Sequence, residues 1–310
     1  MKIGIFGYGS QGRAHALNLR DSGFNITIAN KKNDKFAKQI LKDGFKINSF
    51  NDVAKSSDVI FILLPDHLHK KIFDEIIFKN ARKNTVIIVA HGYSLYFQEV
   101  KINKDYNWYL LAPRYPGLIL REKFLRNEKS NVFFSTIFQR DKKKGKIFKN
   151  IALKLKYKIN SEYKISYEEE AKLDLFIEQY LIPNIINIIE ESFYFLIKKG
   201  FKKTTTLVDL HASGEISELL YKSRLVGIHQ IWKKIASPTC RFGIFQELTK
   251  LKKKKNITIE MEKVLKNIQN GSFNRNLKKE FKKNLINLKN FDKKNNKTVF
   301  YKTIKKISKI

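Results

Sequence analysis

Acidic side chains are concentrated in one short stretch of a chain that has few of them. Glu168–Glu170 come first, and Asp174 and Glu178 follow at a spacing of four residues. On a helix, residues four apart project from the same face, so the two carboxylates would lie about one turn apart. Like charges at this separation repel each other unless a cation lies between them. The stretch therefore predicts a site for a hard cation such as Mg²⁺, whose ligands are oxygens. A solvated acidic helix face is the alternative.

Other residues of suitable type follow strand-like runs or form a second acidic cluster. Asp209 and Glu215 fall in VDLHASGEISELL. His91 ends the apolar run TVIIVAHG, and Arg114 follows the next run, LLAP. Parallel α/β sheets bind ligands outside the carboxyl ends of their strands, so both positions are candidates for a site. Arg114 could hold a carboxylate, whereas a histidine at such a position is as often structural as functional.

The segment GYGSQG at residues 7–12 has the spacing of a dinucleotide-binding turn, and it lies between a strand-like run and a helical one. Gly7 would allow the tight turn, Gly9 would let the backbone approach a pyrophosphate, and Gly12 would let the helix pack closely on the strand. The pyrophosphate would lie at the N-terminus of that helix, where backbone amides and the helix dipole favour an anion. This position in the chain predicts a dinucleotide.

The end of the second strand-like run indicates which dinucleotide binds. NAD sites usually place Asp or Glu there to bind the ribose 2′-hydroxyl. Here the run ends at Asn30, and Lys31 and Lys32 follow. No carboxylate stands at this point to repel a 2′-phosphate, and two cations are available to bind one. The sequence therefore predicts NADP(H).

The elements that position these residues change in type near residue 166. Before it, β-rich runs alternate with helical periods, which predicts βαβ units and a Rossmann-type parallel sheet with helices on both faces. The runs do not alternate in polarity, as expected for strands buried on both sides. The predicted strands are Lys2–Gly7, Asn25–Asn30, Asp58–Pro65, Thr85–His91, Trp108–Pro113 and Asn131–Phe138, with helices such as Gln11–Ser22 and Asp34–Asp43 between them.

Beyond residue 166 the apolar residues recur at helical spacing. One helical stretch runs from Glu168 to Gly200 with Pro183 as its only breaker, and Leu207–Ile231 and Ile259–Asn270 are predicted as further helices. We therefore predict an α/β protein with a dinucleotide-binding domain over residues 1–166 and an all-helical domain over residues 167–310. The run Lys252–Lys255 and the tail from Lys278 are predicted as solvated helix faces or frayed ends.

The composition excludes several classes of protein. The 310 residues are 43% hydrophobic, enough for at least one large core. The net charge is +33, but only 10 of the 62 cationic side chains are Arg. Because base contacts favour Arg, codon bias explains the charge better than specific nucleic-acid binding does. A single cysteine, Cys240, suits a reducing compartment, and no apolar run is long enough to span a membrane, so we predict a cytoplasmic protein.

Seven motifs occur in order from Lys2 to about Glu280: GYGSQGRAHALNLRDSGFN, LLPDHLH, IIVAHGYS, LLAPRYPGLILRE, LDLFIEQ, SPTCRFG and VLKNIQNGSF. Together they resemble the ketol-acid reductoisomerase family in its short form. The resemblance implies an NADPH- and Mg²⁺-dependent enzyme of valine and isoleucine biosynthesis. Such an enzyme moves an alkyl group in 2-acetolactate or 2-aceto-2-hydroxybutyrate and then reduces the product by hydride to a 2,3-dihydroxy acid. It also implies a knotted helical domain that completes the site by dimerisation, so a homodimer or larger homo-oligomer is expected.

The resemblance also assigns roles to residues of this chain. Asp174 would bridge two metal ions and Glu178 would complete the first metal site, while Glu215, with Asp209 nearby, would serve the second. The catalytic set would be His91, Arg114, Glu215 and Ser237, of which Ser237 touches substrate. The cofactor-binding set would be Gly7, Gly9, Ser10, Gln11, Gly12, Asn30, Lys31, Lys32, Pro65, Asp66 and Gly92.

Two positions depart from the pattern of the family. Arg114 stands where most members have Lys, and because Arg keeps its proton near neutral pH, its role there would be electrostatic only. The later acid pair reads His211 and Glu215, where most members have two Glu four residues apart.

Two other functions remain open at this point. A divergent NADP-dependent keto- or hydroxy-acid reductase without the isomerase step would reduce the isomerised keto acid but would leave acetolactate unchanged. A basic nucleic-acid-binding protein would show affinity for nucleic acid that survives physiological salt.

Overall fold

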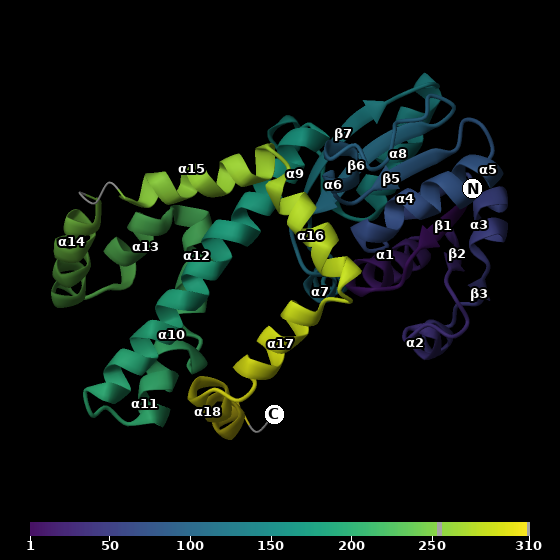
Figure 1. Ribbon diagram of the computed structural model, residues 1–310. Coiled ribbons are helices and arrows are strands. Elements are labelled where there is room, and N and C mark those ends of the chain that lie inside the picture. The colour runs from purple at the N-terminus through teal and green to yellow at the C-terminus, as the bar shows by residue number, and fades with distance from the viewer. Residues whose placement is uncertain (253–255, 309–310) are drawn as a thin grey trace. The chain divides into compact units, whose positions relative to one another are not determined.

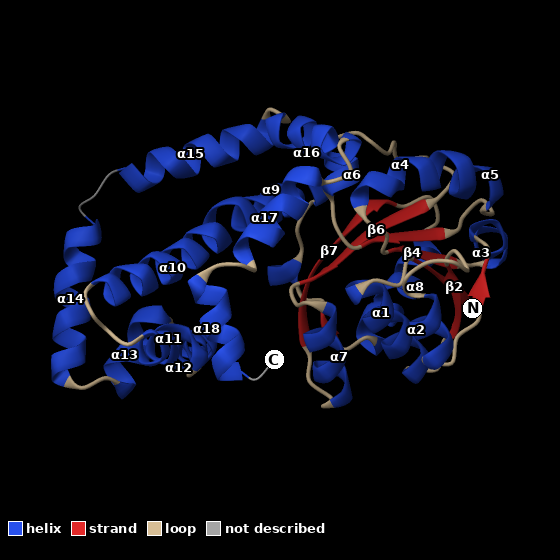
Figure 2. Cartoon of the chain, turned by 60° about the horizontal axis from the view of Figure 1, so that its bottom comes forward, coloured by secondary structure: helices blue, strands red, loops and turns tan. Residues whose placement is uncertain are grey.

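The chain consists of an α/β unit followed by a helical one. The computed structural model describes residues 1–252 and 256–308, and it divides into two compact units, Met1–Asp174 and Leu175–Ile310 (Figure 1). The strands all belong to the first unit (Figure 2). The predicted fold class is therefore confirmed, whereas the knot and the dimer stay predictions. Of the predicted run Lys252–Lys255, all but Lys252 lies outside the described residues.

An eight-stranded sheet forms the centre of the first unit, with the order β3-β2-β1-β4-β5-β6-β7-β8. The strands β1 to β6 pair in parallel, but β7 pairs antiparallel with β6 and β8 pairs in parallel with β7, so the expected parallel sheet ends in two reversed strands. The strands are β1 (Lys2–Phe6), β2 (Asn25–Ala29), β3 (Ile47–Asn48), β4 (Val59–Ile62), β5 (Val86–Val89), β6 (Asn107–Pro113), β7 (Ser130–Phe138) and β8 (Tyr157–Lys158). The prediction missed β3 and β8, which at two residues each are too short to show a pattern.

Helices cover both faces of this sheet, which explains the continuous apolar runs. Neighbouring residues of β1 belong to different apolar clusters, Ile5 to one that includes α1 and α8 and Phe6 to another that includes α3 and η2. Successive side chains of a strand point to opposite faces, so both must be apolar here. The helices are α1 (Ser10–Asp21), α2 (Ala37–Lys42), α3 (Phe50–Ser56), η1 (Asp66–Leu68), α4 (His69–Ile72), η2 (Phe73–Ile77), α5 (Phe78–Asn80), α6 (Tyr93–Tyr96), α7 (Gly117–Leu125), α8 (Lys142–Lys154), η3 (Ser161–Tyr163) and α9 (Tyr167–Phe176).

The second unit is helical, as predicted, but its elements are shorter. The predicted helix Leu207–Ile231 is wrong as one element, because the chain turns at Gly214 and Gly227, whose φ angles are +79° and +92°. The described part of the tail from Lys278 to Ser308 is mostly helical, with turns between its helices. The elements are η4 (Ile177–Leu181), α10 (Ile182–Lys198), α11 (Lys203–Leu207), η5 (Val208–Ala212), α12 (Glu215–Val226), α13 (Ile228–Ile235), α14 (Pro238–Lys252), α15 (Asn256–Gln269), α16 (Ser272–Lys282), α17 (Ile286–Asn295) and α18 (Val299–Ser308).

Pro183 does not break the long helical stretch. It lies in the first turn of α10, directly after the π-helical turn η4. A proline lacks the N–H and its ring presses on the carbonyl group four residues earlier, so a wider turn at that point makes room for it. The predicted break is therefore replaced by a local widening of the helix.

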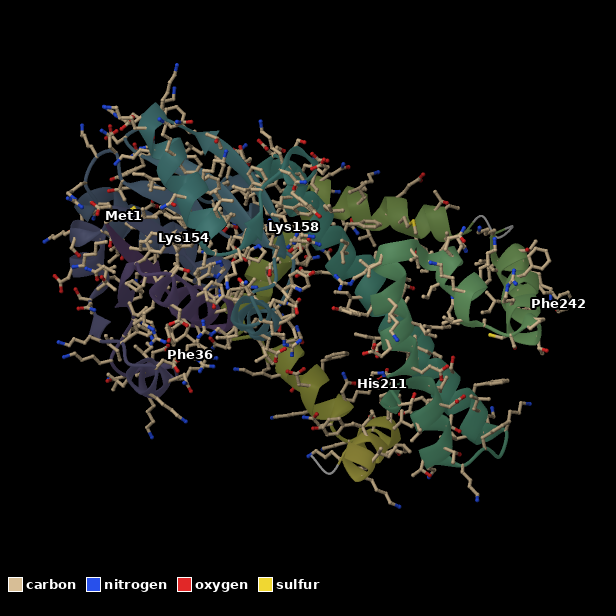
Figure 3. The ribbon with its side chains drawn as sticks, turned by 180° about the vertical axis from the view of Figure 1, so that it is seen from behind. Met1, Phe36, Lys154, Lys158, His211 and Phe242 are labelled. Atoms are coloured by element: carbon tan, nitrogen blue, oxygen red, sulfur yellow. The ribbon has the colours of Figure 1, made fainter. Side chains whose placement is uncertain are left out.

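The large excess of lysine in the composition lies on the surface of the protein. Lysines such as Lys154 and Lys158 are exposed (Figure 3). Among the described helices, none has the length and apolar character needed to cross a membrane.

Candidate active site

The glycine turn after β1 has the close packing that its spacing predicts. Gly7 has a φ angle of +98°, and a Cβ atom there would lie 2.7 Å from the carbonyl oxygen of Leu63. A Cβ atom on Gly12 would lie 2.2 Å from the carbonyl oxygen of Gly7. Gly9, in contrast, faces open space. The turn is thus tight at both ends and has an accessible backbone between them, which fits a bound pyrophosphate.

The side chains of Ser10 and Gln11 contact the loop before α7. The Oγ atom of Ser10 accepts a hydrogen bond of 3.1 Å from the backbone N–H of Gly117. The Nε2 atom of Gln11 donates a bond of 2.7 Å to the carbonyl oxygen of Tyr115. The Oε1 atom of Gln11 is buried and has no hydrogen-bond partner. Both residues therefore connect the start of α1 to the loop that carries Arg114.

A carboxylate lies at the end of β2, where the sequence argument expected none. Asn30 is 8% exposed, and its Nδ2 atom donates to Asp34 Oδ1 over 3.2 Å. The backbone N–H of Phe36 donates to the same oxygen over 2.9 Å. Lys31 and Lys32 are exposed. Asp34 was missed because it stands five residues beyond the last residue of β2 and folds back onto Asn30.

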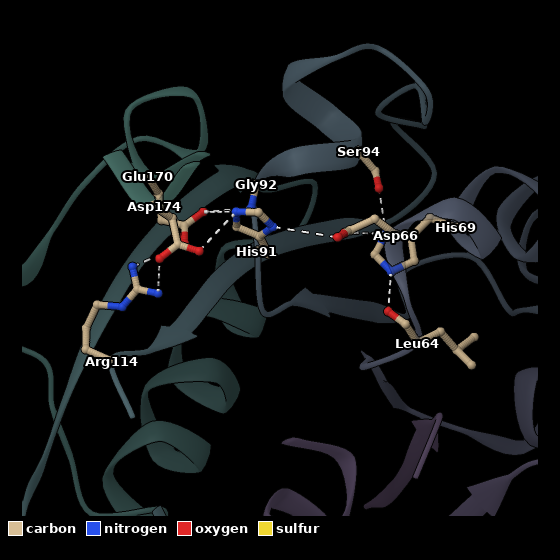
Figure 4. A network of polar contacts seen from close by, with 9 residues as sticks. All are labelled: Leu64, Asp66, His69, His91, Gly92, Ser94, Arg114, Glu170 and Asp174. Atoms are coloured by element: carbon tan, nitrogen blue, oxygen red, sulfur yellow. Dashed lines mark hydrogen bonds and ion pairs between the residues drawn. The ribbon is translucent and has the colours of Figure 1, made fainter. Parts of the chain in front are cut away.

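His91, Glu170 and Asp174 converge at the carboxyl end of β5 (Figure 4). Their ligand atoms all lie within 4.8 Å of one another. The Nε2 atom of His91 is 3.8 Å from Glu170 Oε2 and 3.5 Å from Asp174 Oδ2. The side chain of Glu170 is fully buried, and its Oε2 atom accepts a 2.7 Å hydrogen bond from the backbone N–H of Gly92. Glu170 and Asp174 stand one turn apart on α9, so one helix face delivers both carboxylates.

Arg114 pairs with both of these carboxylates from the end of β6. One terminal guanidinium nitrogen lies 2.9 Å from Asp174 Oδ1, and the other lies 3.5 Å from Glu170 Oε1. The guanidinium carbon lies 5.0 Å from the centroid of the Phe133 ring. The planar fork of Arg suits this bridging of two acids, and a single ammonium group would not span them in the same way.

Asp66 lies on the other side of His91. Its two carboxylate oxygens are 3.9 Å from His91 Nδ1 and 3.7 Å from His69 Nδ1. His69 is buried, with Nε2 2.9 Å from the carbonyl oxygen of Leu64 and Nδ1 2.7 Å from Ser94 Oγ. Asp66 is the first residue of η1 and directly follows Pro65. Both residues were predicted to bind the cofactor, and the carboxylate of Asp66 lies beside His91 (Figure 4).

The charges of this network shift three pKa values. Burial alone would lower the pKa of His91, but the interaction with Asp66 and the charges of Glu170 and Asp174 raise it to about 9. Burial raises the pKa of Glu170, against the opposing effects of His91, the Gly92 N–H and Arg114. Burial would also raise the pKa of Asp66, but its histidine neighbours lower it. His91 is therefore cationic at neutral pH.

Four other predicted site residues belong to the second unit. Glu178 lies in η4, Asp209 in η5, Glu215 at the start of α12, and Ser237 just before α14, where its Oγ accepts from the Cys240 N–H over 3.2 Å. All four are exposed. Their part in a site stays a prediction.

The pairing of acids within the first unit differs from the one that the spacing argument singled out. That argument joined Asp174 to Glu178, whereas here Asp174 meets Glu170, at the same spacing in the other direction. Glu170 was missed because it belongs to the run Glu168–Glu170, which also fits an exposed helix start. Its spacing to Asp174 is the signal that could have found it.

A Rossmann-type sheet, a glycine turn and a carboxylate cluster around the buried Glu170 at one sheet edge are features of NAD(P)-linked oxidoreductases. Residues 1–155 match the family model for the NADPH-binding domain of acetohydroxy acid isomeroreductase. Residues 167–310 match the model for the C-terminal domain of ketol-acid reductoisomerase. The chain belongs to the ketol-acid reductoisomerase family, which confirms the predicted family and enzyme class.

Individual relatives agree with this assignment. The ketol-acid reductoisomerase (NADP(+)) of Helicobacter pylori strain HPAG1 is 31% identical over 282 residues, which cover 88% of this chain and 82% of that protein. The enzyme of the same name from Xanthomonas euvesicatoria pv. vesicatoria is 30% identical over 292 residues, 94% of this chain and 86% of that protein. A solved NADH-preferring ketol-acid reductoisomerase from an uncultured archean superposes with a TM-score of 0.91 at 21% identity, covering 100% of this chain and 94% of that chain. This last match shows the shared fold.

Proposed function

We propose that this chain catalyses the ketol-acid reductoisomerase reaction of branched-chain amino-acid biosynthesis with NADPH and Mg²⁺. An alkyl group migrates in 2-acetolactate or 2-aceto-2-hydroxybutyrate, and hydride reduction then gives the 2,3-dihydroxy acid. The observation that carries the proposal is the convergence of His91, Arg114, Glu170 and Asp174 at the sheet edge. The glycine turn follows β1 at this same edge, because β1, β4, β5 and β6 are parallel neighbours.

The first unit fits a bound NADPH, which supplies the hydride. The open backbone at Gly9 and the buried, unpaired Oε1 atom of Gln11 are features that a dinucleotide would cover. Lys31 and Lys32 would bind the 2′-phosphate. Asp34 opposes this with its own charge, but its Oδ1 atom already accepts two hydrogen bonds within the turn. The NADP(+) in the names of the relatives supports the same preference.

The carboxylate cluster fits Mg²⁺. The ligand atoms of Glu170 and Asp174 lie within 4.8 Å of each other and of His91. The carboxylates of Glu170 and Asp174 would hold the metal, with Glu178, Glu215 and Asp209 as the further predicted ligands. A bound Mg²⁺ supplies a Lewis acid that polarises the carbonyl group of the substrate.

His91 and Arg114 would act on the charge that develops on substrate oxygens. The Nε2 atom of His91 is buried without a hydrogen-bond partner, so it could donate a hydrogen bond to an oxygen of the substrate. Asp66 on the Nδ1 side keeps the ring oriented. Arg114 holds Asp174 in place and stabilises negative charge without giving up its proton.

The second unit would supply the remaining residues and the contact with a second copy of the chain. Ser237 would touch the acetohydroxy acid. Large apolar side chains are exposed along α10, among them Ile185, Ile186 and Ile188. Exposed apolar side chains of this size on one helix support a homodimer or larger homo-oligomer.

The test is NADPH oxidation by the purified protein with 2-acetolactate, followed by absorbance. Oxidation is expected only when Mg²⁺ is present, and chelation should stop it. A reductase without the isomerase step would instead oxidise NADPH with the isomerised 3-hydroxy-2-keto acid while leaving acetolactate untouched. That result would replace the proposed activity by the alternative one.

A further inference from the structure

Gln11 occupies a position between the glycine turn and the loop that carries Arg114. It is the second residue of α1, and its Nε2 atom donates to the carbonyl oxygen of Tyr115 over 2.7 Å. A carbonyl oxygen only accepts hydrogen bonds, so the amide group of Gln11 must face it with its nitrogen. The Oε1 atom is thereby directed away from the loop, and it is buried without a donor. Buried polar atoms are nearly always paired, so we expect a bound ligand to supply the hydrogen-bond donor for the Oε1 atom of Gln11.

The loop from Arg114 to Gly117 is held to α1 at further points. The backbone N–H of Gly117 donates to Ser10 Oγ over 3.1 Å, and a Cβ atom on Gly117 would lie only 2.0 Å from the Ser10 carbonyl oxygen. Farther along the two helices, Arg121 donates to the side chain of Asn18 over 2.8 Å. The start of α7 therefore follows the start of α1 closely, and the Arg114 loop cannot shift without breaking these contacts.

We propose that Gln11 is a positioning residue that links cofactor binding to the placement of Arg114. Its Nε2 atom holds the Arg114 loop, and its Oε1 atom accepts a hydrogen bond from a hydroxyl or amide donor of the bound dinucleotide. The inference rests on the proposed function, because it assumes that the N-terminus of α1 binds the pyrophosphate. It adds that Gln11 acts in the reaction through Arg114, whose guanidinium holds Asp174 at 2.9 Å.

The link is tested by hydrogen exchange of the peptide around residues 113–120, with and without NADPH. In the unmodified protein NADPH should slow exchange of this peptide as well as of the start of α1. In Gln11→Ala the peptide should exchange at least about tenfold faster, since the Tyr115 contact is lost, and it should no longer respond to NADPH. Gln11→Met keeps the length of the side chain without its hydrogen-bond donor and acceptor. It should show the same faster exchange and the same loss of the NADPH response, and it replaces Gln11→Ala if that variant does not fold.

Turnover gives the second readout. In both Gln11 variants kcat with 2-acetolactate should fall about tenfold or more even at saturating NADPH, because the Arg114 loop loses its contact with Gln11 and with it the link to the bound cofactor. Asn80→Ala is the matched control, since it also removes a hydrogen bond from a side-chain amide to a backbone carbonyl, that of Ile76 at 2.8 Å. It should leave the exchange of the 113–120 peptide and its response to NADPH unchanged.

The outcomes separate this inference from the proposed function. If the unmodified protein turns over acetolactate but the Gln11 variants keep both the NADPH response of the loop and the original kcat, the inference is wrong and the function stands. If the unmodified protein is inactive, yet NADPH slows loop exchange in a manner that requires Gln11, the link stands and the proposed activity fails.

Discussion

The two units of the chain differ in whether their predicted site residues contact one another within the unit. In the first unit Asp174 lies within contact distance of both His91 and Arg114, and the buried Glu170 accepts a backbone hydrogen bond. In the second unit the acids and the serine assigned to the site are all exposed. Apolar residues are exposed there as well, Leu225 at 77% and Ile188 at 63%. The first unit thus organises its charges by itself, whereas the second leaves its predicted site residues and large apolar side chains exposed.

The largest effect is expected from Asp174, at the centre of the organised cluster. Asp174→Asn keeps the shape of the side chain but removes the charge that pairs with Arg114 and would hold Mg²⁺. NADPH oxidation with 2-acetolactate should fall by at least about 10³-fold, in line with the loss of a preorganised charge in an active site. Steady-state kinetics at saturating Mg²⁺ would measure it.

Asp141→Asn is the control for that change. Asp141 caps α8 by accepting from the Lys143 N–H, and Asn caps helices equally well, so activity should be retained. Near-normal turnover by Asp174→Asn would contradict the role given to the cluster.

We expect the exposed apolar residues of α10 in the second unit to determine whether the protein forms an oligomer. Ile188→Asp places a charge in the exposed apolar side of α10, and we expect it to shift the protein to monomers and to lower acetolactate turnover about 100-fold or more, because isolated charges are costly to bury in an interface. NADPH affinity, a property of the first unit, should persist. Sedimentation velocity and fluorescence titration would measure both.

Asn187→Asp on the same helix adds the same charge at an exposed polar position and provides the comparison. An Ile188→Asp protein that keeps its assembly and its activity would show that this surface is not an interface.

A smaller effect is expected from His15 of the first unit, on the stability of the fold at low pH. His15 is fully buried, and burial lowers its pKa to about 4, against a small opposing effect of its hydrogen bond to the Gln11 carbonyl. In the unfolded chain it binds a proton below about pH 6.5. Its contribution to stability is therefore complete above pH 6.5 and is lost as the pH falls toward 4, by roughly 3 kcal/mol in all.

Denaturant unfolding at several pH values would show this dependence. Replacing His15 by Gln should flatten it between pH 6.5 and 4, whereas the same change at His229, which is exposed in the second unit, should not. If the His15 and His229 variants showed the same pH dependence of the free energy of unfolding, the loss of stability at low pH would come from groups other than His15.

The smallest effect is expected at the exposed lysines after β2. Replacing Lys31 and Lys32 together by Ala should raise the KM for NADPH about tenfold and leave kcat nearly unchanged, because charges that bind a phosphate hold the cofactor without touching the reacting atoms. The KM for NADH, which lacks that phosphate, should stay the same. A matching rise in the KM for NADH would mean that the lysines do not contact the 2′-phosphate.

Much of the fold could be predicted because it depends on residues that are close in sequence. The six longer strands, the glycine turn and α1 follow from apolar runs and from the positions of Gly7 and Gly12. Gly227, which ends α12, and the π-helical turn before Pro183 were not predicted. Glycine and proline mark places where the chain can change direction, but only the packing around them decides whether it does.

The chain by itself determined the six longer strands, the change from an α/β to a helical unit, and the family. Only the tertiary structure decided that Glu170 meets Asp174, that Asp66 stands beside His91, and that Gln11 holds the Tyr115 carbonyl. The Gly92–Glu170 and Gln11–Tyr115 hydrogen bonds join residues 78 and 104 positions apart. A spacing rule describes neighbours on one element, whereas these contacts exist because parallel strands end at one edge of the sheet and bring distant loops together there.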